Sequence, residues 1–112
     1  MRLREIPVRE WGEFLDKLAR EHRAWLASVD CAGRVEAREQ PLQSISARDG
    51  IDIHIGKRAI HVDEPRAVCV EETPEGAAQA LVIDDAAGER WTLRFRIAVP
   101  PGVLDGRAPG ET

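Results

Sequence analysis

Polar and apolar side chains alternate in one short stretch of the chain, and the polar side chains could bind a metal ion. They are Asp52, His54, His61 and Asp63. If Ile55 pairs with Ile60 across a four-residue turn, one face of a hairpin carries both histidines opposite each other and both aspartates opposite each other. Cβ atoms of facing residues lie about 4.5–5.5 Å apart, a spacing at which imidazole and carboxylate groups suit zinc or another first-row metal. The alternative, which we favour, is an ordinary solvated strand face.

A second candidate site is a basic stripe on the last predicted strand. Its members are Arg90, Arg94 and Arg96, joined by Arg66 from another strand. Such a stripe suits an acidic protein segment or a nucleic-acid backbone. We favour the alternative that the arginines pair with carboxylates across neighbouring strands, as is common in sheets. The candidate carboxylates are Glu71, Glu72 and Asp84.

The other residues whose side chains could take part in catalysis or metal binding are His22, Cys31 and Cys69. His22 could act as a general base, because imidazole titrates near neutrality. A histidine near the end of a helix is more often a cap or a residue at the edge of the core. The cysteines have no metal or disulfide spacing and indicate buried thiols. Glycine-rich phosphate loops, nucleophile elbows and HExxH motifs are absent from the sequence. We therefore predict no catalytic residue and no cofactor.

The elements that position these residues begin with a predicted amphipathic helix from about Val8 to His22, after a short polar lead. Apolar and aromatic residues recur there at steps of three and four, typical of one helix face. The members of this stripe are Trp11, Phe14, Leu15, Leu18 and His22. Pro7 suits the first helical turn, where its missing N–H costs nothing.

From Trp25 onward the period of alternation changes to two, which predicts strands. Turn signals at 32–33, 49–50, 56–59 and 73–76 separate them. The predicted strands cover residues 25–31, 35–47, 51–55, 60–62, 66–71, 78–84 and 90–97. Pro41 and Pro65 interrupt two of these segments, and a proline inside a strand indicates a bulge or a sheet edge.

These elements predict an α+β fold. One N-terminal amphipathic helix is followed by an antiparallel β-meander of about six strands, because short turns join antiparallel neighbours. The apolar face of the sheet must be covered, and the two prolines favour curling, so we expect a strongly bent sheet or a partly open small barrel. We expect one domain over residues 1–99 and a flexible Pro/Gly-rich tail over 100–112.

Composition limits the functions that the chain can have. Its 112 residues are 43% hydrophobic and carry a net charge of −4, which fits one globular domain and argues against a nucleic-acid partner. No apolar run reaches the roughly 18 residues of a membrane span, and the N-terminus is unlike a signal peptide. We therefore expect a cytoplasmic location and no membrane partner. The best-supported class is a small non-enzymatic interaction or accessory protein.

Such a protein could accept a partner strand, or a second copy of the chain as a homodimer, at a sheet edge beside Pro41 or Pro65. Metal binding and weak nucleic-acid binding at the two candidate sites above are the alternatives.

Several short motifs run through most of the chain in a fixed order. They are Ile6-Pro7 before Glu10-Trp11, Glu21-His22-Arg23 before Trp25-Leu26, Pro41-Leu42 to Ile45, Ile51 to Gly56, Glu71-Glu72-Thr73 with Glu75-Gly76-Ala77, and Arg94-Phe95-Arg96. In order and spacing they resemble a family of small bacterial proteins of unknown function. The resemblance implies a bacterial source. It implies no activity, cofactor or catalytic residue.

Overall fold

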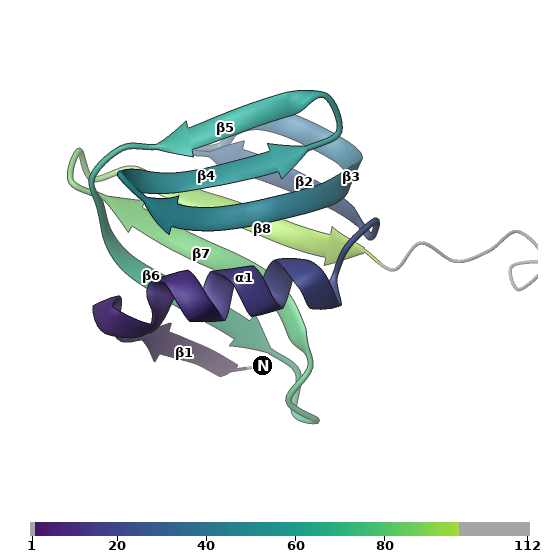
Figure 1. Cartoon of the computed structure of the whole chain (residues 1–112), viewed down its shortest axis with the longest axis horizontal. Helices are drawn as coiled ribbons and strands as arrows, with labels where there is room; N and C mark the ends of the chain where they lie inside the picture. The colour runs from purple at the N-terminus through teal and green to yellow at the C-terminus, as the bar shows by residue number, and fades with distance from the viewer. Residues whose placement is uncertain (1, 97–112) are drawn as a thin grey trace, which may run out of the picture.

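A computed structural model of the chain describes residues 2–96, which form one helix and one antiparallel eight-stranded sheet that is not closed (Figure 1). The strands are β1 (Arg2–Ile6), β2 (Leu26–Cys31), β3 (Arg34–Arg48), β4 (Gly50–Ile55), β5 (Arg58–Val62), β6 (Pro65–Glu72), β7 (Ala78–Asp85) and β8 (Arg90–Arg96). The predicted end of the last strand at residue 97 and the predicted tail lie outside the described residues.

The predicted helix forms as a 3₁₀ turn, η1 (Val8–Glu10), that continues into α1 (Trp11–Glu21). Its stripe packs on the sheet as expected: Leu15, Leu18 and Ala19 are buried, and Trp11 and Phe14 pack against the core from its margin. Neither η1 nor α1 has the length and apolar character needed to cross a membrane.

The strands lie in the order β1-β6-β7-β8-β2-β3-β4-β5. The expected architecture of a helix with an open antiparallel sheet is confirmed, but there are eight strands rather than about six. They also form two meanders instead of one: β2–β5 and β6–β8 are separate runs, joined where β8 pairs with β2. The additional strand, β1, precedes the helix and pairs with β6.

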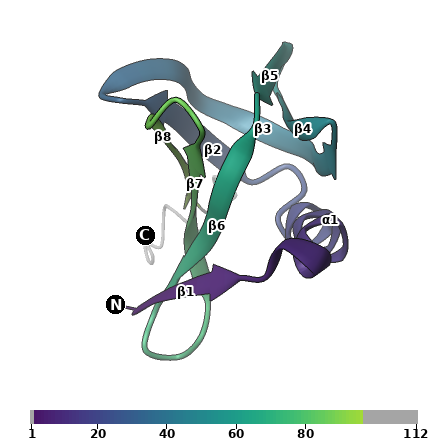
Figure 2. The same ribbon diagram turned by 90° about the vertical axis from the view of Figure 1, so that its left-hand side faces the viewer.

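The long strand β3 bends the sheet, as Figure 2 shows. Its first part pairs with β2 as far as Pro41, which lies opposite Leu26, and its second part pairs with β4 from Leu42 onward. Glu39, two residues before the proline, has a φ of 45°. Pro41 therefore marks a bend, as predicted. The expected unpaired side next to it is compatible with these pairings, because before the proline β3 pairs with β2 alone and after it with β4 alone within the described residues.

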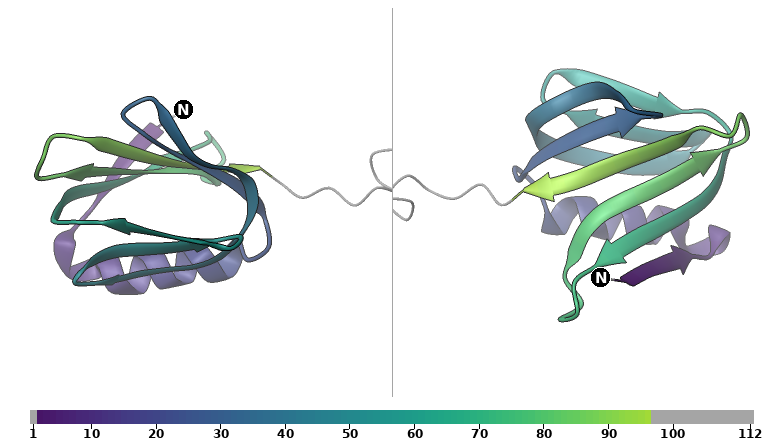
Figure 3. Two further views of the ribbon diagram at one scale, coloured as in Figure 1. Left: turned by 90° about the horizontal axis from the view of Figure 1, so that it is seen from above. Right: turned by 180° about the vertical axis from the view of Figure 1, so that it is seen from behind.

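The core fills the concave side of the bent sheet (Figure 3), and α1 packs beside the second part of β3, between it and β1 (Figures 1 and 2). The alternating isoleucines Ile51, Ile53 and Ile55 of β4 are all buried. From the opposite wall, Leu81, Ile83 and Leu93 complete the interior. Strand period and helix stripe thus direct apolar side chains into one shared core.

Candidate functional site

The predicted metal-site residues lie on the β4–β5 hairpin, but in a different register. Ile55 lies opposite Arg58, so the turn contains only Gly56 and Lys57. Gly56 adopts a φ of 59°, which favours glycine at the first central position of a tight hairpin turn. The predicted pairing of Ile55 with Ile60 is therefore wrong by two residues, because the turn is two residues shorter than expected.

The new register brings Asp52 opposite His61 and leaves His54 opposite Ala59. His61 Nδ1 lies 2.7 Å from Asp52 Oδ1, and His61 Nε2 lies 3.9 Å from an oxygen of Asp63. The hydrogen bond with Asp52 is the main reason why the pKa of His61 is raised above its ordinary value. Among residues 2–96, no group of three or more His, Cys, Asp and Glu side chains is placed to hold a metal ion.

Three of the four arginines of the predicted basic stripe have a carboxylate partner, on the adjacent strand β7 or one strand further away on β6 and β3, and Arg66 forms no ion pair within residues 2–96. The pairs are Arg90 with Asp84 at 2.8 Å, Arg94 with Glu71 at 3.3 Å and Arg96 with Glu39 at 2.6 Å. The hydrogen bond from Arg90 also holds the pKa of Asp84 below its usual value. A nucleic-acid backbone would have to compete with these carboxylates for the guanidinium groups.

A third site, which the sequence did not reveal, is a cleft of about 470 Å³ between α1 and the β6–β7 turn; we call it the α1 cleft. Its apolar wall is formed by Phe14, Leu18, Trp25 and Val70. Its polar side chains are Arg4, Lys17, Glu21, His22 and Glu72. The volume of this cleft, which has both apolar and polar lining residues, lies in the range of small-molecule sites.

His22 is the most deeply placed polar residue of the α1 cleft, with only 7% of its surface exposed. Its ring stacks on Phe95 at a centroid distance of 4.2 Å and meets the edge of Trp25 at 4.5 Å. Nδ1 lies 2.8 Å from the carbonyl oxygen of Leu18, so this nitrogen carries the hydrogen and donates it. Nε2, at the other side of the ring, has no hydrogen-bond partner within the described part of the chain.

Glu72 forms the opposite polar side of the α1 cleft and is 8% exposed. Arg4 Nη2 lies 3.2 Å from one of its oxygens, and Arg2 Nη2 lies 3.5 Å from the other. The hydrogen bond from Arg4 is the largest cause of the lowered pKa of Glu72. The Arg4 guanidinium also lies 5.7 Å from the centre of the Phe14 ring, so β1 supplies one wall of the cleft.

The start of α1 holds β1 in place, because the indole Nε1 of Trp11 donates a hydrogen bond of 2.9 Å to the carbonyl oxygen of Ile6. Sequence reasoning found His22 through its place in the helical stripe, but it missed Arg4, and it assigned Glu72 to the arginines of β8 instead of to Arg4. The two residues are 68 positions apart, and no local pattern brings them together.

The two cysteines are free thiols, Cys31 buried and Cys69 half-buried. Burial is the main cause that raises the pKa of each thiol. A raised pKa lowers the thiolate fraction and thus the reactivity of a cysteine.

Comparison with known proteins gives no assignment for this arrangement. The chain matches no protein-family model, no curated protein and no solved structure. The family resemblance drawn from the sequence motifs therefore stays a prediction, and function has to be inferred from the site itself.

Proposed function

We propose that the chain is a small non-enzymatic binding protein whose ligand site is the α1 cleft. The observation that carries this proposal is His22, a buried imidazole clamped between two aromatic rings at the wall of an open cavity. Buried polar atoms normally have a hydrogen-bond partner. A ligand or a water molecule in the cleft is the partner that the geometry leaves for Nε2.

The other lining residues favour binding over catalysis. Glu72 is already engaged by two arginines. The lining residues within the described part of the chain include no serine, threonine or cysteine that His22 could activate. The apolar wall of Phe14, Leu18 and Trp25 can bury the body of a ligand, and the few polar groups can orient it.

A neutral apolar dye, N-phenyl-1-naphthylamine, tests the proposal without assuming the ligand's charge. We expect saturable enhancement of its fluorescence on addition of the protein. Ala77 is an exposed residue of the β6–β7 turn that lines the cleft, so Ala77→Phe should fill the opening and abolish the enhancement. Ala87→Phe, in the turn at the opposite end of β7, is the matched control and should bind like the wild type.

Circular dichroism would verify that both variants keep the wild-type fold. Absence of saturable dye binding to the wild-type protein would contradict the proposal. So would dye binding that is the same in the wild type, Ala77→Phe and Ala87→Phe, because the dye would then occupy some other surface.

A protein partner or a second copy of the chain is the second candidate. Its supporting observation is that β1 and β5 each leave one side of the backbone unpaired in the described sheet, and such edges can accept another strand. Light scattering at two protein concentrations tests self-pairing. A mass of one chain at both concentrations would exclude it.

Metal binding at the β4–β5 hairpin is a third candidate, favoured by one contact. Asp52 holds Nδ1 of His61, and carboxylates commonly orient metal-binding histidines in this way. Zinc should then raise the melting temperature of the wild type but not that of the His54→Ala, His61→Ala double variant. Equal behaviour of the two proteins would remove this candidate.

A further inference from the structure

We infer that the ligand of the α1 cleft is an uncharged aromatic compound that donates a hydrogen bond, such as an indole or a phenol, an inference that rests on the proposed function. His22 accepts this hydrogen bond through Nε2, and the flat ring of the ligand lies against Phe14 and Trp25. All three residues line the same cavity.

His22 decides which partner of the hydrogen bond the ligand must be. Its Nδ1 lies 2.8 Å from the carbonyl oxygen of Leu18, which can only accept, so Nδ1 carries the hydrogen. In the neutral ring the other nitrogen, Nε2, is then an acceptor. His22 is 7% exposed, and buried polar atoms normally have a partner. A ligand with an O–H or N–H group supplies that partner, whereas a carboxylate would place its own lone pairs against the lone pair of Nε2.

The charges of the lining favour an uncharged ligand. Arg4 and Lys17 are positive and Glu21 and Glu72 are negative, so the four charges cancel. Arg2 also reaches Glu72, at 3.5 Å, but it lies outside the lining and its side chain is 74% exposed, so water and salt screen its charge. An ionised ligand would therefore lose part of its hydration without meeting a net opposite charge.

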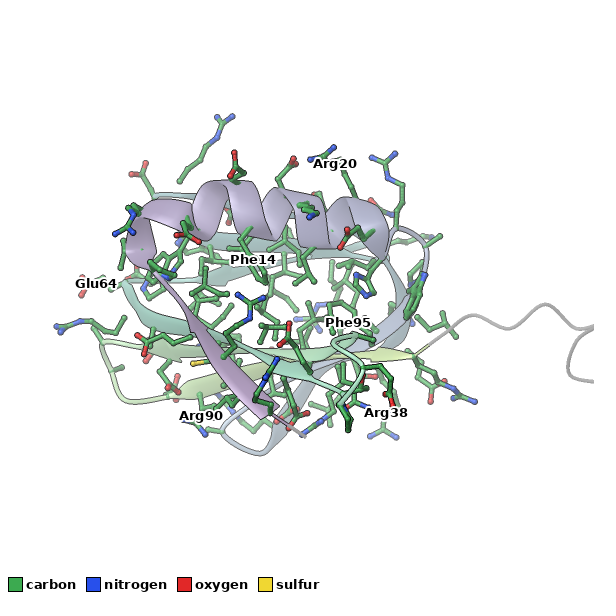
Figure 4. The ribbon with its side chains drawn as sticks, turned by 90° about the horizontal axis from the view of Figure 1, so that it is seen from below. Phe14, Arg20, Arg38, Glu64, Arg90 and Phe95 are labelled. Carbon is green, nitrogen blue, oxygen red and sulfur yellow. The ribbon has the colours of Figure 1, made fainter. Side chains whose placement is uncertain are left out.

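The apolar part of the lining favours a flat ring. Phe14 and Trp25 are half-buried and keep aromatic surface exposed, whereas Leu18 and Val70 are buried. Figure 4 shows Phe14 on the side of α1 that faces the sheet. Aromatic rings pack on one another in offset-stacked or edge-to-face arrangements, so an aromatic compound suits these two side chains better than a sugar or a branched aliphatic chain.

A matched pair of ligands tests the inference: indole, whose N–H can donate, and benzofuran, which has the same shape with an oxygen in place of the N–H. Each is titrated into a mixture of the protein and N-phenyl-1-naphthylamine at pH 8.5, where neutral imidazole ordinarily predominates. Loss of the dye fluorescence measures displacement. We expect indole to displace the dye at an about fivefold lower concentration than benzofuran, the effect of one hydrogen bond between neutral groups. Indole-2-carboxylate, which keeps the N–H but adds a negative charge, should displace the dye less well than indole.

The outcomes separate the inference from the proposed function. If indole and benzofuran displace the dye equally well, or if neither displaces it, the inference is overturned while the proposed function stands. The inference is also overturned if indole-2-carboxylate binds as tightly as indole. If the dye does not bind to the wild-type protein, the proposed function is wrong and the inference falls with it.

A matched pair of variants locates the hydrogen bond. His22→Phe keeps a flat ring but removes Nε2, so indole and benzofuran should displace the dye equally well from this variant. His54→Phe makes the same change at an exposed position of β4 and should keep the fivefold preference for indole. A preference that persists in both variants would show that another group accepts the hydrogen bond.

Nitrogen NMR gives the same test in the wild-type protein, without a substitution in the core. The chain has three histidines, so isotope-labelled histidine gives few signals. Indole should move the Nε2 signal of His22 because this nitrogen accepts the new hydrogen bond, and benzofuran should move it much less. His54 and His61 are internal controls and should respond to neither compound. An Nε2 signal of His22 that stays unchanged at saturating indole would contradict the inference.

Discussion

Gly50 begins β4 at a point where the neighbouring strand leaves no room for a side chain. A Cβ atom placed there would lie 2.5 Å from the carbonyl oxygen of Val62 and 2.8 Å from Cε1 of His61. The φ of this residue is 96°, a backbone angle that residues with a side chain rarely adopt. We expect Gly50→Ala to lower the free energy of unfolding by about 2–4 kcal/mol, from strain and from displaced backbone, measured by urea denaturation.

Gly88→Ala separates the two causes. Gly88 has a similar φ of 85°, but no atom lies within 4 Å of the position of its Cβ. Backbone strain is the only destabilising effect expected at this position, so Gly88→Ala should lower the free energy of unfolding by about 1 kcal/mol. If both variants lose the same stability, the close approach of β5 to Gly50 has no energetic consequence.

The pair formed by Asp52 and His61 should make stability depend on pH. Because the pKa of His61 is raised in the folded protein, the stabilisation is fully present below the ordinary histidine pKa of about 6.5. It is lost as the pH rises through the folded-state value. Asp52→Asn should therefore lower the melting temperature at pH 5.5 and leave it almost unchanged at pH 8.5.

Proton NMR titration of the His61 ring gives the direct measurement. The pKa should fall in Asp52→Asn, since the hydrogen bond with Asp52 is the largest cause of the shift. His54, which lies opposite Ala59, provides an internal reference in the same spectra. A pKa of His61 that does not change would show that Asp52 is not its partner in solution.

At the scale of elements, the turn of the β2–β3 hairpin contains backbone strain at Ala32 that a substitution could relieve. Its turn residues Ala32 and Gly33 have φ values of 51° and 86°, and this conformation favours Asn-Gly. Ala32 is exposed, so Ala32→Asn removes no packing. We expect it to raise the free energy of unfolding by about 0.5–1 kcal/mol, measured in urea. Ala86→Asn, in a turn without positive φ at that residue, should change it by less than about 0.5 kcal/mol.

Elements with a strong period could be predicted from the sequence, and those without one could not. α1 has a clear apolar stripe, and β4 alternates isoleucine with polar residues. β1 lacks such a pattern because Ile6 is its single buried residue. The register of β4 with β5 was missed because alternation defines the faces of a strand but not the length of the turn beside it.

At the scale of the whole molecule, the pairing of β8 with β2 joins the two meanders into one sheet. Leu93 lies at this junction, opposite Val29 on one side and Leu81 on the other, and is 1% exposed. Leu93→Ala should lower the free energy of unfolding by about 2–5 kcal/mol. Fluorescence and circular dichroism should report one shared urea transition, as for small single domains. Separate transitions would show that the meanders unfold independently.

Leu3→Ala is the control for this prediction. Leu3 lies on the edge strand β1 and is 54% exposed, so the same truncation should cost less than about 1 kcal/mol. A comparable loss in both variants would contradict the central role of the junction.

The α1 cleft could not be predicted because it exists only at this larger scale. Its polar groups come from β1, α1 and β6, and its wall includes the turn that follows β6. The sequence places Lys17 and His22 on one helix, but Arg4 and Glu72 meet through pairing of β1 with β6. Predicting the site would have required the strand order, which depends on contacts between distant segments.

The junction of β2 with β8 also sets the order in which a ribosome can complete this molecule. Trp91 of β8 pairs with Cys31 of β2, so β2 emerges long before its second neighbour has been translated. At about 5–20 residues per second, the wait is roughly 3–12 s. During that time the backbone of β2 has no paired strand on the side that later pairs with β8. A chaperone that shields unpaired strands would act on this intermediate and release it when the final strand arrives.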